Sequence, residues 1–208
     1  FRRRPVPGID ATPDTRLSLA AFMARTTLVQ MEEHDRVEFE MDRAGVEVTH
    51  GRAMIEGPNT VAIHRPDGTI DRVRTEFTLV STGSRPARPD WIDFDHPHIV
   101  DADGLLALER MPRSITIVGG GVIGSEYACI FAELGIPTTL IEPRNGLMRF
   151  LDEEIRERLE SAMVETGIDL RLGRKPVAVT GADGHAVVEL DDGERLESDI
   201  VLWSLGRQ

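Results

Sequence analysis

The chain has 208 residues, of which 40% are apolar, and its 36 acidic and 24 basic side chains give a formal net charge of −12. This apolar content can fill one large or two modest cores, and the acidic balance argues against binding to nucleic acid or anionic membranes. Cys129 is the only cysteine, which excludes an internal disulfide or a redox-active cysteine pair within these residues. No apolar run approaches the roughly 20 residues that span a bilayer, so a cytoplasmic location is expected.

The first part of the chain predicts a helix followed by short antiparallel strands. Residues 1–13 carry three arginines and three prolines and indicate an extended lead-in. The composition from Asp14 to about Arg43 predicts a helix. The charged residues 32–35 allow a break in this helix, and Gly45 is a suitable residue to end it. Alternating apolar residues and short turns then predict an antiparallel meander, with strands expected at residues 46–48, 61–63, 70–73 and 77–80.

A proline-rich stretch follows the meander. Pro86, Pro89 and Pro97 favour irregular structure. We therefore assign residues 1–85 to a first domain, residues 86–112 to a linker and residues 113–208 to a second domain.

The second domain opens with a strand, a tight turn and a helix. Residues 115–118 are all β-branched and predict a strand. Gly119, Gly121 and Gly124 follow with the spacing G-x-G-x-x-G, and an apolar-periodic helix begins at Val122. In such a turn the first glycine permits the bend, the second lets a diphosphate approach the backbone, and the third lets the helix pack on the strand. The open N–H groups at the helix start then face the phosphates.

A second strand at residues 138–141 ends in Glu142, roughly 20 residues beyond the first glycine. A carboxylate at this place can accept hydrogen bonds from a ribose 2′- and 3′-hydroxyl pair. The alternative is a glycine-rich turn with Glu142 as an ordinary solvated strand end. The complete strand–turn–helix–strand–acid context favours a dinucleotide site.

The remaining residues complete a layered α/β fold. Asp152 is a suitable N-cap, and Glu154 and Arg158 have favourable spacing on the helix that follows, which stops at Gly167. Strands are expected at residues 168–172, 177–179, 186–190, 195–197 and 200–203, the last almost wholly apolar. The order of elements predicts a doubly wound parallel sheet with an antiparallel excursion before the last strand.

Three segments together resemble the flavoproteins that have two dinucleotide-binding domains. Residues 81–86 are similar to the A-T-G-S-x-P segment where that family's chain leaves the FAD domain. Residues 119–124 with Glu126 resemble its NAD(P) fingerprint, and residues 205–207 resemble the glycine–arginine segment after that domain's last strand. Within the family, residues 94–106, 150–154 and 204–208 are similar to the soluble pyridine nucleotide transhydrogenases.

The resemblance implies a Rossmann-like NAD(P) domain preceded by part of an FAD domain, made of a helix and antiparallel strands. It implies hydride transfer between NADPH and NAD through FAD, with FAD, NAD and NADP as cofactors and nicotinamide dinucleotides as partners. The chain is then expected to be an internal piece of a longer, homo-oligomeric protein. Because the cofactors carry the chemistry, no catalytic residue is expected here. No metal site is expected either, because the six histidines are scattered and the pair His96 and His98 lacks further ligands.

The resemblance also implies cofactor contacts. Gly119, Gly121 and Gly124 should hold the diphosphate, and Glu142 the adenosine ribose. Its charge should repel the 2′-phosphate of NADP, although nearby Arg144 could offset it, so NAD(H) is expected to bind more tightly than NADP(H). The other expected contacts are Val122 and Ile123 beside the dinucleotide, Gly206 near the nicotinamide half, Thr82 and Gly83 in the FAD part, and Glu126 near the flavin. An equally good interpretation is that Glu126 has no cofactor contact and that its carboxylate interacts favourably with the positive end of the dipole of its own helix.

Two other interpretations stay open. One is a flavin disulfide reductase of the dihydrolipoamide dehydrogenase kind, which requires a cysteine pair upstream of these residues. The other is a nucleotide-binding module without catalysis, because the family's principal FAD anchor is not among these residues.

Overall fold

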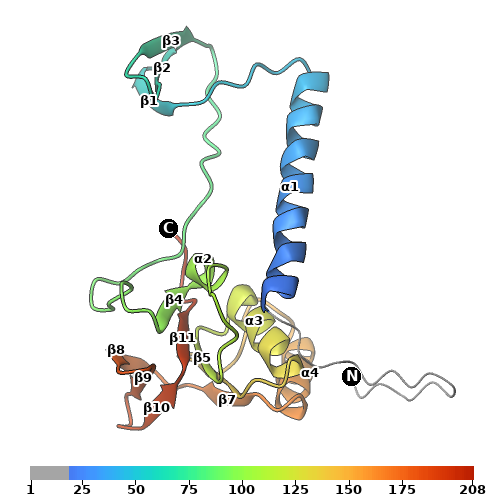
Figure 1. The fold of residues 1–208 in the computed structure, drawn as a ribbon, viewed down its shortest axis with the longest axis vertical. Helices are drawn as coiled ribbons and strands as arrows, with labels where there is room; N and C mark the ends of the chain where they lie inside the picture. The colour runs from blue at the N-terminus through green and yellow to red at the C-terminus, as the bar shows by residue number, and fades with distance from the viewer. Residues whose placement is uncertain (1–18) are drawn as a thin grey trace, which may run out of the picture. The chain divides into compact units, whose positions relative to one another are not determined.

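The computed structural model describes residues 19–208, with side chains from residue 28 onward, as two compact units (Figure 1). One comprises residues 21–83 and the other residues 84–208. The arginine-rich lead-in and the expected helix start at Asp14 lie outside the described residues.

The first unit consists of one long helix and a small sheet. Helix α1 (Leu19–Arg43) is continuous through residues 32–35, where the sequence allowed a break, and ion pairs such as Arg36–Glu33 join neighbouring turns there. The helix ends at Arg43, and Gly45 follows with a φ of +68°, which suits the glycine stop that the sequence predicted. Strands β1 (Arg52–Gly57), β2 (Thr60–His64) and β3 (Ile70–Arg74) form an antiparallel sheet in that order.

Two strands expected in this unit are wrong, and one that exists was not predicted. Residues 46–48 and 77–80 are apolar and alternating, yet neither forms a strand. A strand requires a partner for its backbone N–H and C=O groups, and no described segment pairs with either. Phe77 and Leu79 are accordingly 88% and 91% exposed. Strand β1 was missed because it pairs with β2 across a short turn that the alternation did not reveal.

The second unit is built on a five-stranded parallel sheet, as predicted, in the order β4-β11-β5-β6-β7. The strands of this sheet and the helices between them are, in chain order, β4 (Ile99–Asp101), α2 (Ala102–Leu105), β5 (Ile115–Val118), α3 (Val122–Glu133), β6 (Thr138–Glu142), α4 (Glu153–Glu165), β7 (Asp169–Leu172) and β11 (Ile200–Trp203). The predicted antiparallel excursion is the meander β8 (Pro176–Ala182), β9 (His185–Leu190) and β10 (Arg195–Ser198).

The parallel sheet is covered on both faces. Ile117 and Leu140 pack with Phe131 of α3 and Met163 of α4 in one buried cluster. Their neighbours in the strands, Val118 and Ile141, join a second cluster that includes β8 and β9. Burial on both faces explains why these strands are continuously apolar rather than alternating.

The stretch assigned to a linker contains regular structure. Residues 99–101 form β4, an edge strand that pairs in parallel with β11, and α2 follows it directly. The sequence did not predict this three-residue strand, because β4 forms only through its pairing with β11, which lies far away in the sequence. None of the described helices has the length and apolar character needed to cross a bilayer.

Candidate functional site

The turn after β5 is shaped by two glycines that have no room for a side chain. Gly119 has a φ of +116°, and a Cβ there would lie 2.9 Å from the carbonyl carbon of Ser204. A Cβ on Gly124 would lie 1.8 Å from the carbonyl oxygen of Gly119. The outer glycines of the motif are therefore required for the bend and for packing α3 against it, as the sequence predicted.

Gly121, the middle glycine, differs from both. A Cβ there would meet no atom within 4 Å, and its φ of −75° is accessible to any residue. It is the N-cap of α3, and within the described residues no side chain caps this helix start. Gly121 is exposed, and the first-turn N–H groups have no side-chain acceptor among the described residues, as is typical of a helix start that binds an anion.

Glu142 lies beside this turn, at the end of β6. It is only 5% exposed, so it is not a solvated strand end. Its Oε2 accepts a hydrogen bond from the Gly120 N–H at 2.8 Å, and its Oε1 accepts one from the Arg144 N–H at 2.9 Å. A carboxylate has about four acceptor positions, so two are left for further donors such as ribose hydroxyls.

The other predicted contact residues are divided between the two compact units. Val122 and Glu126 are exposed on the first turns of α3, Ile123 is half-buried, and Arg144 is exposed beside Glu142. Gly206 follows β11 with a φ of +89°. Thr82 and Gly83 are exposed at the end of the other unit, so the structure does not place them relative to the turn. The cofactor roles of all these residues stay predictions.

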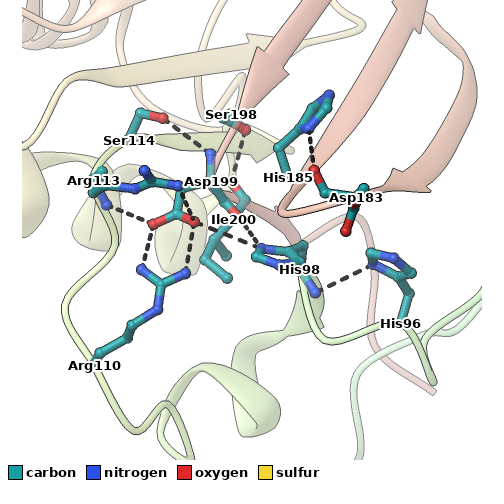
Figure 2. Close-up of polar contacts among 10 residues, drawn as sticks. All are labelled: His96, His98, Arg110, Arg113, Ser114, Asp183, His185, Ser198, Asp199 and Ile200. Carbon is teal, nitrogen blue, oxygen red and sulfur yellow. Dashed lines mark hydrogen bonds and ion pairs between the residues drawn. The ribbon is translucent and has the colours of Figure 1, made fainter.

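A second polar cluster, which the sequence did not reveal, lies at the opposite end of β11 (Figure 2). The side chain of Asp199 is 2% exposed and accepts two hydrogen bonds from the Arg110 guanidinium, at 2.6 and 2.8 Å. Its Oδ2 also accepts from the Arg113 N–H at 2.8 Å, and His98 Nδ1 donates to its main-chain carbonyl at 2.6 Å.

These contacts saturate the Asp199 carboxylate. Hydrogen bonds from Arg110, joined by those from Arg113, hold the pKa of this carboxyl well below its ordinary value despite burial. Such a group stays ionised and is a poor proton acceptor. The hydrogen bonds from Arg110 and Arg113 fasten the start of β11 to the loop between α2 and β5. Among the described residues no group of histidine, cysteine and acidic side chains is placed to hold a metal ion.

Comparison with known protein families shows the family to which the chain belongs. The sequence profile of the pyridine nucleotide-disulphide oxidoreductases matches residues 5–208. The chain belongs to this family. As the resemblance implied, similar members of this oxidoreductase family include curated soluble pyridine nucleotide transhydrogenases. That of Colwellia psychrerythraea is 38% identical over 166 residues, which cover 80% of this chain and 36% of the relative. That of Mycobacterium bovis is 32% identical over 211 residues, which cover all of this chain and 45% of the relative.

Solved structures of other proteins share the fold. LpdA from Mycobacterium tuberculosis matches with a TM-score of 0.83 at 24% identity, over 92% of this chain and 43% of its own. The flavoprotein disulfide reductase RclA from Escherichia coli matches with a TM-score of 0.78 at 22% identity, over 91% and 43% of the two chains. The chain thus spans less than half the length of the relatives it matches.

Proposed function

We propose that this chain supplies the dinucleotide-binding part of a flavin-dependent oxidoreductase that moves hydride between NADPH and NAD through FAD. The observation that carries the proposal is the uncapped start of α3 at Gly121, open to solvent between two close-packed glycines and beside the buried Glu142. The names of the curated relatives support the reaction class. Because the chain covers only part of their length, the activity is proposed for a longer protein.

In this proposal the residues of the chain bind and orient, and the flavin, when bound, accepts and returns the hydride. The dinucleotide diphosphate lies against the backbone of Gly121 and the first turn of α3, and the adenosine ribose lies at Glu142. Gly206 borders the nicotinamide half. Residues 113–208 then form the NAD(P) domain, and residues 1–85, with Thr82 and Gly83, form part of the FAD domain.

Titration of the protein with NADH and NADPH tests the proposal. We expect NADH to bind about tenfold more tightly, because a buried carboxylate at the adenosine ribose accepts from its hydroxyls and repels a 2′-phosphate. Calorimetry or nucleotide fluorescence gives both dissociation constants. Tighter NADPH would contradict the role given to Glu142, and failure to bind either nucleotide would contradict the proposed function.

A flavin disulfide reductase is the second candidate, favoured by the fold shared with proteins such as RclA. The only cysteine of the chain does not suit that chemistry. Cys129 is half-buried on α3, and burial raises the pKa of its thiol, which lowers the fraction of reactive thiolate. This candidate therefore needs a cysteine pair outside the 208 residues.

A further inference from the structure

The peptide group between Gly119 and Gly120 is held at both of its polar atoms. Its carbonyl oxygen accepts a hydrogen bond from Ser204 Oγ at 2.9 Å, and the same hydroxyl lies 3.1 Å from the Val118 carbonyl oxygen, so its one proton is shared with the shorter contact at Gly119. Its N–H donates to Glu142 Oε2 at 2.8 Å. The plane of this peptide sets the direction in which the chain enters Gly121 and α3, so two side chains from different strands fix the orientation of the turn.

Ser204 is placed for this contact by β11, which ends at the preceding residue. Its N–H donates to the carbonyl of Val118 at 2.8 Å, which continues the pairing of β11 with β5. Its Oγ then lies where a side chain on either outer glycine of the motif would be. A Cβ on Gly119 would be 2.9 Å from this oxygen, and a Cβ on Gly124 would be 2.6 Å from it. One small hydroxyl therefore contacts the turn and the start of α3 together.

The opposite flank of the turn is also closed. A Cβ on Gly120 would lie 2.3 Å from Leu147 Cδ2 and 3.2 Å from Glu142 Oε2. Gly121 alone of the four positions opens onto free space. The turn is thus clamped on two sides and open on the side where the proposed diphosphate would lie.

We propose that Ser204 is a positioning residue for the dinucleotide diphosphate, which it does not touch but whose binding turn it holds ready. This inference rests on the proposed dinucleotide binding. A turn that is already ordered loses less conformational entropy when the ligand binds, so the ligand binds more tightly. Without the Ser204 hydroxyl, the Gly119 carbonyl loses its side-chain donor and the peptide can rotate, so affinity for a diphosphate should fall.

The test compares Ser204→Ala with a matched variant at Ser198, the last residue of β10, two residues before β11 begins. Ser198 is 5% exposed, and its Oγ donates to the Ile200 carbonyl at 2.9 Å, so Ser198→Ala, like the change at half-buried Ser204, deletes one hydroxyl bonded to backbone. We expect both variants to lose similar thermal stability. Only Ser204→Ala should bind NADH and ADP-ribose less tightly, by about five- to tenfold, the scale of one hydrogen bond.

Adenosine, which has no diphosphate, is the control ligand, and its weak binding is followed by NMR shifts. Its dissociation constant should be the same for Ser204→Ala and the unmodified protein. Unchanged NADH affinity in Ser204→Ala, an equal loss in Ser198→Ala, or an equal loss for adenosine would each overturn the role of Ser204. If the unmodified protein binds neither NADH nor ADP-ribose, the proposed function fails first and this inference falls with it.

Discussion

Gly121→Asp is expected to abolish dinucleotide binding while the fold remains intact. Position 121 has the extended φ and ψ of an N-cap, and a Cβ there meets no neighbour. Aspartate is among the best N-cap residues, so the melting temperature should stay the same or rise slightly. The new carboxylate would occupy the open side of the turn and repel a diphosphate, so NADH affinity should fall by about 100-fold or more.

Two further variants separate the causes of this loss. Gly121→Asn is similar in size and also caps helices, so it should weaken NADH binding less than Gly121→Asp by removing only the repulsion. Gly57→Asp adds the same charge at another glycine whose Cβ would meet no neighbour, and it should leave binding unchanged. NADH affinity within about threefold of the unmodified protein in Gly121→Asp, where repulsion predicts a much larger loss, would show that the diphosphate does not lie at this turn.

Asp199→Ala is expected to give the largest loss of stability of any variant considered. It removes the acceptor of the Arg110 pair and leaves the Arg113 N–H without its partner. Breaking a buried network of this kind should lower the free energy of unfolding by about 3 kcal/mol. For a chain of this size the melting temperature should fall by roughly 6–12 °C, measured by thermal denaturation at neutral pH.

The effect of Asp199→Ala should depend on pH. The pKa of Asp199 is lowered in the folded state, so its stabilisation is complete above the unfolded pKa, near 4, and is lost as pH falls toward the folded pKa. The difference between variant and unmodified protein should therefore shrink below about pH 4. Asp183→Ala, at an exposed carboxylate near the same cluster, should change stability by less than about 0.5 kcal/mol. Equal losses in the two variants would contradict the structural role of Asp199.

The sequence predicted those parts of the fold that local chemistry determines. The glycine motif and the β-branched run predicted β5, the turn and α3, because the positive φ of Gly119 and the contact of Gly124 with the Gly119 carbonyl are local requirements. Asp152 caps α4 as expected, with its Oδ1 accepting from the Glu154 N–H at 3.0 Å. The turn before β9 falls at Gly184, whose φ is +77°, where Asp183-Gly184 indicated it.

What escaped prediction depends on partners distant in the chain. Edge strand β4 exists through its pairing with β11, and Asp199 is joined to Arg110 across 89 residues. The sequence identified Glu142 but not its backbone donors, which come from the turn and from the following loop. Ser204 lies in a segment that resembles the transhydrogenases, but nothing in the sequence indicated its contact with the turn after β5.

The most direct test of the central claim is an NMR titration that records backbone amide shifts as NADH is added. A dinucleotide seated at the start of α3 should shift the amides of Gly119 to Gly124 and of Glu142 to Arg144, and leave the Asp199 cluster at the other end of β11 unchanged. Shifts confined to other parts of the protein, or no shifts at saturating NADH, would contradict the account.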